Sequence, residues 1–104
     1  MKVSIPSFQF DDIMLETFKK GVAVESYFKK FSKPYHGMLV LEKGEFSQAI
    51  SGLNVKWADQ YKLSEMFDAI DLAVHGNYQR RLRIEDLGEA VLINALHNIE
   101  EYQA

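Results

Sequence analysis

The three histidines are the residues best suited to acid–base or metal chemistry. They stand at His36, His75 and His97, too far apart to form a close-spaced ligand pair such as His-x-x-x-His. His97 shares a helical face with Glu100 and Glu101, which would give two ligands on an exposed surface. A surface histidine is the commoner meaning of this spacing, so we expect no metal and no other cofactor.

Nucleophilic catalysis has little support in the sequence. The chain has no cysteine, and none of its seven serines lies in a Gly-x-Ser-x-Gly elbow. Adjacent acids at Asp11-Asp12, Glu85-Asp86 and Glu100-Glu101 do not face each other on a helix, which argues against a general acid–base pair. The six glycines are scattered and form no phosphate-binding motif. We therefore predict a protein that is not an enzyme.

An arginine cluster is the sharpest local signal. Arg80, Arg81 and Arg83 precede the last predicted helix and follow Tyr78. Guanidinium groups at the start of a helix are suited to bind phosphate together with the free backbone N–H groups. Pairing of the arginines with nearby acids, such as Glu85 and Glu89, is the commoner meaning of such a cluster. Contact with a partner or a nucleic acid is the alternative.

Three further aromatic residues are candidates for a contact surface. Trp57, Tyr61 and Tyr78 lie in polar surroundings, unlike the other aromatic residues. Trp, Tyr and Arg are over-represented among the anchors of protein interfaces. We therefore predict that these residues and the arginine cluster contact a partner.

Ile93 is the remaining candidate contact. On a helical wheel it lies roughly 180° from Ile84 and Tyr102, at about 100° per residue, in the middle of an acidic face. Three interpretations remain open. Ile93 is a single exposed apolar residue, or another segment covers this face, or the face binds a partner or a second copy of the chain.

Length and composition limit the fold and the location. A chain of 104 residues forms one domain, residues 1–104, and 47% apolar residues are ordinary for a globular protein. The absence of cysteine fits a reducing compartment. The chain has neither the apolar run of a signal peptide nor that of a membrane span, so we expect a cytoplasmic protein.

The charge is uneven along the chain. The net charge is −3, which argues against a protein that binds polyanions over its whole surface. Residues 1–52 hold seven lysines and six acidic residues, a charge of +1. Residues 53–104 hold five basic and nine acidic residues, a charge of −4. An acidic second half is more often a solvated surface than a site.

These residues must be positioned by a mainly helical α+β fold with two or three short strands. Apolar periodicity predicts about four helices, at residues 11–20, 23–31, 64–75 and 84–103. We expect Asp11 to cap the first helix, with Met14, Leu15 and Phe18 on its apolar face, and Gly21 to end it.

The remaining segments include the strands. Residues 2–9 alternate around Pro6 and predict an edge strand or an extended lead-in. Residues 38–41 fit a buried strand, and residues 78–82 a short link or strand. Residues 45–50 fit either a hairpin strand or a helical turn, of which we favour the helix, with Phe46, Ala49 and Ile50 inward.

The later helices carry further predictions. Ser64 is placed to cap the third helix, on which Asp68 and Asp71 face outward. Asp86 stands at the third position of the last helix, where a carboxylate can accept from free N–H groups. The apolar stripe of that helix is predicted at Ile84, Leu87, Val91, Ala95, Ile99 and Tyr102. The predicted core comprises Phe18, Phe28, Leu39, Leu41, Phe67, Ile70, Val91 and Ile99.

The leading hypothesis is a non-catalytic protein-binding module. It would act as an inhibitor, adaptor or assembly factor of a larger protein, in the manner of phage or mobile-element products that block host machinery. One alternative is a nucleic-acid-binding accessory protein that uses Arg80, Arg81 and Arg83, and another is a small enzyme of unknown type. A homodimer is considered beside these.

Overall fold

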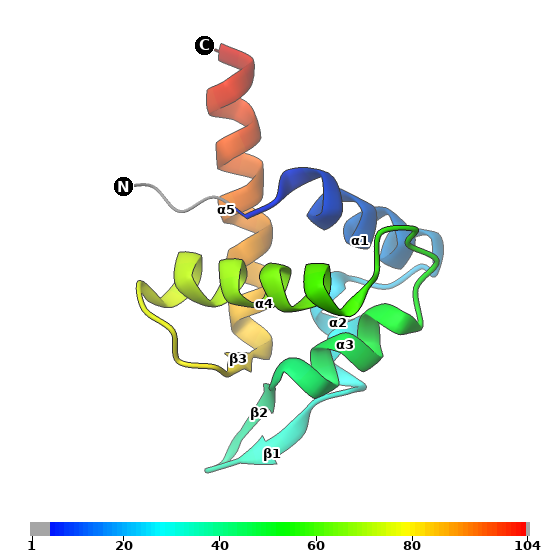
Figure 1. Cartoon of the computed structure of the whole chain (residues 1–104), viewed down its shortest axis with the longest axis vertical. Helices are drawn as coiled ribbons and strands as arrows, with labels where there is room; N and C mark the ends of the chain where they lie inside the picture. The colour runs from blue at the N-terminus through cyan, green and yellow to red at the C-terminus, as the bar shows by residue number, and fades with distance from the viewer. Residues whose placement is uncertain (1–4, 104) are drawn as a thin grey trace.

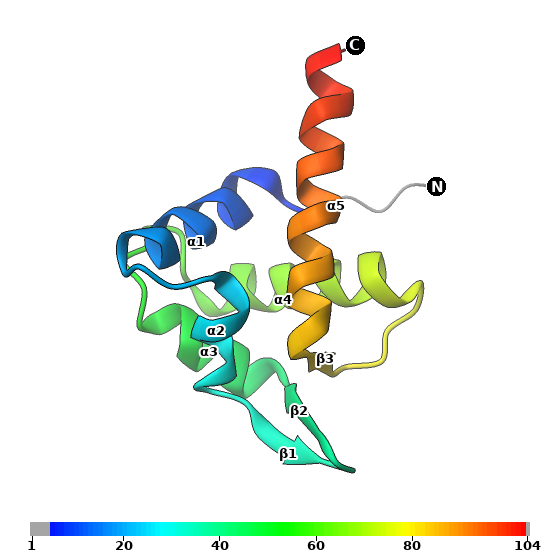
Figure 2. The same cartoon turned by 180° about the vertical axis from the view of Figure 1, so that it is seen from behind.

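The computed structural model describes residues 5–103, with side chains described up to residue 99. Within that range the chain forms five α-helices and one three-stranded sheet, which confirms a small, mainly helical α+β fold. Helix α5 (Ile84–Gln103) runs along the long axis, and α4 (Gln60–His75) crosses it (Figure 1). Helices α1 (Ser7–Lys19) and α2 (Val24–Lys29) lie beside α5 (Figure 2). None of the described helices is both long and apolar enough to cross a bilayer.

Helix α1 begins earlier than predicted. The expected extended segment at residues 2–9 is wrong for its second part, because the helix starts at Ser7 with Pro6 as N-cap, and residues 1–4 lie outside the described range. The carbonyl of Pro6 accepts from the N–H of Phe10 at 3.0 Å. A proline at this place sacrifices no helical hydrogen bond, since the first N–H groups of a helix have no partner within it. Asp11 is therefore inside the helix and does not cap it.

The buried face of α1 also differs from the prediction. Phe10, Ile13 and Thr17 are buried, whereas Leu15 is half exposed and Phe18 is 78% exposed. Both sets have helical spacing, so periodicity could not decide between them. The helix ends as expected, with Gly21 at a φ of 75°.

A β-hairpin follows α2. Strand β1 (Lys33–Tyr35) pairs antiparallel with β2 (Met38–Leu41), and β2 pairs with β3 (Leu82–Arg83). The predicted strand at residues 38–41 is confirmed, but only its second half is buried and Leu39 is exposed. The two-residue turn at His36 and Gly37 has positive φ at both positions, the geometry that suits the twist of a hairpin. Because the first position of the turn holds histidine and not Asn, Asp or Gly, the sequence did not predict it.

Helices α3 (Lys43–Ser51) and α4 complete one side of the core. The favoured helix at residues 45–50 is confirmed, with Phe46, Ala49 and Ile50 fully buried. Helix α4 begins at residue 60 and not at residue 64. Asp59 is its N-cap, and its Oδ1 accepts from the N–H of Lys62 at 2.9 Å.

The hydrophobic core is organised by three phenylalanines from three different helices. Phe28 stacks on Phe46 at a centroid distance of 5.4 Å, and Phe46 meets Phe67 edge to face at 5.6 Å. Four predicted core residues are buried here: Phe28, Leu41, Phe67 and Ile70. Four others are not fully buried: Phe18, Leu39 and Ile99 are exposed, and Val91 is partly buried.

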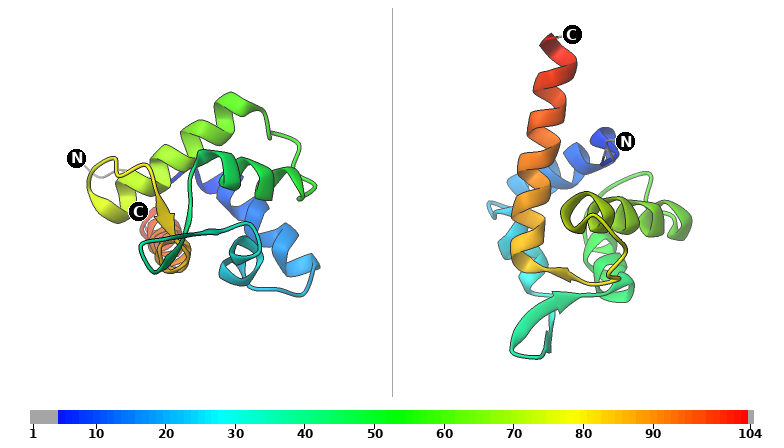
Figure 3. Two further views of the ribbon diagram at one scale, coloured as in Figure 1. Left: turned by 90° about the horizontal axis from the view of Figure 1, so that it is seen from below. Right: turned by 90° about the vertical axis from the view of Figure 1, so that its left-hand side faces the viewer.

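Helix α5 has the predicted limits but turns a different face to the core. Leu87, Ala90 and Asn94 are buried, so the core lies to one side of the predicted stripe. Ile93 is partly buried and packs against the core, in agreement with the interpretation that another segment covers its face. The C-terminal part of α5 extends beyond the other helices (Figure 3, right). Within the described residues, no other helix therefore lies beside this part of α5.

Candidate functional site

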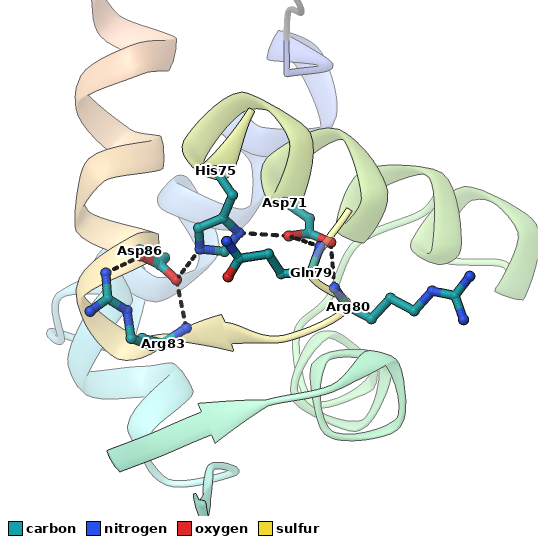
Figure 4. A network of polar contacts seen from close by, with 6 residues as sticks. All are labelled: Asp71, His75, Gln79, Arg80, Arg83 and Asp86. Carbon is teal, nitrogen blue, oxygen red and sulfur yellow. Dashed lines mark hydrogen bonds and ion pairs between the residues drawn. The ribbon is translucent and has the colours of Figure 1, made fainter. Parts of the chain in front are cut away.

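A buried network of charged side chains joins α4, the following loop and the start of α5 (Figure 4). His75, in the last turn of α4, lies between two buried carboxylates. Its Nδ1 is 2.6 Å from Asp71 Oδ1, and its Nε2 is 2.9 Å from Asp86 Oδ2. Asp71 was predicted to face outward, and this is wrong. The left-handed Gly76 turns the chain back, so that α5 brings Asp86 to the far side of the imidazole.

The geometry favours the charged form of His75. An ionised carboxylate only accepts hydrogen bonds, so both contacts are hydrogen bonds at once when both ring nitrogens donate. Burial opposes this charge, but the hydrogen bonds and negative charges of Asp71 and Asp86 outweigh it and raise the pKa of His75 above its ordinary value. Both ring nitrogens point at carboxylates, so neither is placed to take a proton from a substrate. This arrangement is suited to holding the loop in place.

The same carboxylates fix the backbone of the loop between α4 and β3. Asp71 accepts from the N–H of Gln79 at 3.2 Å and from the N–H of Arg80 at 2.8 Å. Asp86 accepts from the N–H of Arg83 at 2.8 Å. This last bond confirms the predicted role of Asp86 at the third position of its helix. The network as a whole was not predicted from the sequence, although the four-residue spacing of Asp71 and His75 places them on one face of a helix.

The structure separates the three arginines of the cluster. Arg83 contacts Asp86 through Nη2 at 3.3 Å, and Arg81 contacts Glu42 through Nε at 3.1 Å. The predicted pairing with acids therefore has the right chemistry but other partners than Glu85 and Glu89. Arg81 also lies over the ring of Tyr35, 3.9 Å from its centroid. The guanidinium of Arg80 extends away from the network (Figure 4).

Nearby acids interrupt the basic character of this region. Lys33 donates to Glu42 at 2.6 Å, and this hydrogen bond lowers the pKa of Glu42. Arg80 and Tyr78 line a cavity of about 510 Å³, together with Glu42, Lys43 and Asp68. Arg80 thus lies at a cavity that Arg81 and Arg83 do not line, and Glu42, the partner of Arg81, borders that cavity.

The remaining predicted contact residues are dispersed. Trp57 is partly buried and donates from Nε1 to Asp12 Oδ2 at 2.9 Å, which ties the loop before α4 to α1. Tyr61 and Tyr78 are exposed, near the start of α4 and after its end respectively. Ile93 faces the core. These residues and the arginines do not form one surface.

The described residues include no group of three His, Cys, Asp or Glu side chains arranged to hold a metal ion. His97 is partly buried, and the side chains of Glu100 and Glu101, its predicted neighbours, lie outside the described residues.

A second feature is the outward side of α5, which sequence analysis did not single out. Leu92, Leu96 and Ile99 are 64%, 61% and 52% exposed. They lie on the side of the helix opposite to the buried Ala90, at about 100° per residue. A helix that is apolar on opposite sides is normally covered on both. We call the stripe formed by Glu85, Glu89, Leu92, Leu96 and Ile99 the outer face of α5.

A groove of about 560 Å³ adjoins this face. It lies between α1, the start of α2 and α5, and its lining is mainly apolar: Met14, Phe18, Val22, Val24, Val91 and Leu92. The exposed Phe18 was predicted to be a core residue. Its ring stands at the groove together with Leu92, so the apolar surface continues from α1 to α5. Contiguous exposed apolar surface of this kind marks interaction sites.

Comparisons of this chain with protein-family models, with curated proteins and with solved structures found no match.

Proposed function

We propose that this protein is a non-catalytic protein-binding module, and that it docks a partner protein on the outer face of α5 and the adjoining groove. The observation that carries the proposal is the exposure of Leu92, Leu96 and Ile99 on the side of α5 opposite to the core. Exposed aliphatic side chains on a helix that already has a core-facing side gain free energy only when a partner covers them. The protein would act by occupying part of a larger protein, as an inhibitor, adaptor or assembly factor.

The docking surface differs from the one predicted from sequence. Phe18, Leu96 and Ile99 replace Trp57, Tyr61 and Ile93 as the proposed anchors. Trp57 and Ile93 are engaged with Asp12 or with the core. Tyr61 is exposed on α4, which does not line the groove. A cytoplasmic location remains part of the proposal, on the basis of the cysteine-free sequence.

Nucleic-acid binding has less support. Arg81 and Arg83 are paired with Glu42 and Asp86, and a paired guanidinium must give up its carboxylate before it contacts a phosphate. The network around His75 accounts for the loop geometry without any ligand.

The test is affinity capture with three forms of the tagged protein, with nuclease present in every sample. Leu96→Gln removes an exposed apolar side chain without adding charge, and Tyr61→Gln is the matched control on α4. We expect a stoichiometric protein retained by the natural chain and by Tyr61→Gln, and reduced about ten-fold by Leu96→Gln. This factor follows from covering a leucine that is 61% exposed, worth about 1–2 kcal/mol of binding free energy. Equal capture by Leu96→Gln would refute the proposed surface.

A further inference from the structure

The outer face of α5 has the register of a helix-packing seam. Its residues follow each other at spacings of four and three: Glu85, Glu89, Leu92, Leu96 and Ile99. This alternation keeps side chains on one line when two helices pack at a shallow angle. The seam is divided into a carboxylate half in the first turns of α5 and an aliphatic half toward its C-terminal end.

The charge around this seam has one sign. From residue 84 onward the chain contains five acidic residues and no lysine or arginine. Glu85 and Glu89 are exposed, and within residues 5–99 no cationic side chain forms an ion pair with either. The carboxylate of Glu25 lies over Gly88, where an added Cβ would stand only 2.7 Å from Glu25 Oε1. Three carboxylates therefore border the same end of the seam.

This charge pattern selects among occupants. A second copy in parallel register would bring Glu85 and Glu89 against their own counterparts, which is unfavourable for like charges. In antiparallel register over the whole seam, Glu85 and Glu89 would lie against Ile99 and Leu96, where they would lose water without gaining a partner. A helix with cations at the corresponding end would pair with them. Its aliphatic side chains would cover Leu92 and Leu96, and a bulky side chain beside them would enter the groove next to Phe18.

We infer that the occupant of the outer face of α5 is an amphipathic helix of a partner protein, with an aliphatic seam and lysine or arginine residues at one end. The inference rests on the proposed function, to which it adds the chemistry and orientation of the partner. The cationic end of the bound helix lies beside Glu85 and Glu89, and its aliphatic part lies along Leu92, Leu96 and Ile99.

The experiment uses two synthetic helical peptides that share a leucine seam and differ in two residues at one end, two lysines or two glutamates. Binding of each labelled peptide to the full chain is measured by fluorescence anisotropy at low and at high salt. We expect the lysine peptide to bind about ten-fold more tightly at low salt, since two exposed pairs each change from repulsive to attractive. The ratio shrinks at high salt because exposed charges are screened.

Variants of the protein supply the controls. Combining Glu85→Lys with Glu89→Lys reverses the preference, so that the glutamate peptide binds more tightly. Leu96→Gln weakens both peptides by about ten-fold, and Tyr61→Gln leaves both unchanged.

The outcomes separate the two proposals. If both peptides bind equally and both are weakened by Leu96→Gln, the face docks a helix but the inferred charge of the partner is refuted. If sedimentation shows a dimer of this chain that Leu96→Gln dissociates, the occupant is a second copy and the inference is overturned. If neither peptide binds, the inference also fails, and the capture experiment with Leu96→Gln decides the proposed function separately.

Discussion

Replacing His75 by alanine tests whether the buried network stabilises the fold. The change leaves Asp71 and Asp86 buried without the charged imidazole between them. Removing one partner from a buried charged group costs about 3–5 kcal/mol. Each carboxylate keeps two other donors, namely two backbone N–H groups for Asp71 and the N–H and guanidinium of Arg83 for Asp86. We therefore expect the lower end, a loss of about 3 kcal/mol in the free energy of unfolding at pH 6.

The raised pKa of His75 determines the direction in which the free energy of unfolding changes with pH. Because the pKa of His75 is raised in the folded protein, the folded state binds one more proton than the unfolded state between pH 6.5 and the folded pKa. The stabilisation is complete below pH 6.5, and it is lost as the pH rises through the folded pKa. In this window the free energy of unfolding falls by up to about 1.4 kcal/mol per pH unit. The difference between the natural chain and His75→Ala must therefore narrow toward high pH.

Urea unfolding between pH 5 and pH 9 measures both quantities. At pH 6 the midpoint of His75→Ala should lie about 1–3 M below that of the natural chain. His36→Asn is the matched control, because His36 is exposed in the hairpin turn and asparagine tolerates its positive φ of 48°. This control should change the free energy of unfolding by about 0.5 kcal/mol or less. A loss below about 1 kcal/mol for His75→Ala, or a difference that stays constant with pH, would show that a charged His75 does not stabilise the fold.

Four further substitutions test the packing by urea unfolding. Tyr27→Phe removes the hydroxyl that donates to the carbonyl of Ala49 and should cost about 1 kcal/mol. Gly52→Ala places a Cβ 2.7 Å from that hydroxyl and should cost about 1–2 kcal/mol in the natural chain. The cost should be clearly smaller when Tyr27 is already Phe, because the hydroxyl is then absent. If the two losses simply add, the contact between residue 52 and the hydroxyl is contradicted. Gly76→Ala should cost about 1 kcal/mol because φ is 76° there, and a neutral result would mean that the turn after α4 adapts. Phe10→Ala should cost about 3–5 kcal/mol in the free energy of unfolding, because Phe10 is buried in the first turn of α1. If α1 began at the predicted cap Asp11 instead, replacing Asp11 would be the more destabilising change.

The helices could be located from the sequence because their signals are local. The limits of α5, the helix at α3 and the end of α4 at Gly76 follow from periodicity and from glycine at a helix end. The inward residues of α3 were also predictable, because in a short amphipathic helix only one face contains Phe46, Ala49 and Ile50. The early start of α1 was not predictable, because proline is found both in extended segments and at helix N-termini, so Pro6 does not distinguish the two.

Choosing the buried face of α1 and α5 required the tertiary structure. Both helices have apolar residues on more than one side, so periodicity permits several faces, and the packing of α2 and α4 against them selects one. This selection makes Phe18 and Ile99 exposed and covers Ile93. The candidate docking surface could not be predicted for this reason, since periodicity places Phe18 and Ile99 in the core.

The class of fold, the positions of most helices and the role of Asp86 at the start of α5 follow from the amino-acid sequence, because each depends on residues within a few positions of one another. Which charged residues are buried, and which apolar residues are exposed, depends on how distant segments pack. Asp71 and Asp86 are fifteen residues apart and share His75 only because the chain reverses at Gly76. The arginines, which looked like one site along the chain, were divided in the same way, because Glu42 and Asp86 reach them from different elements.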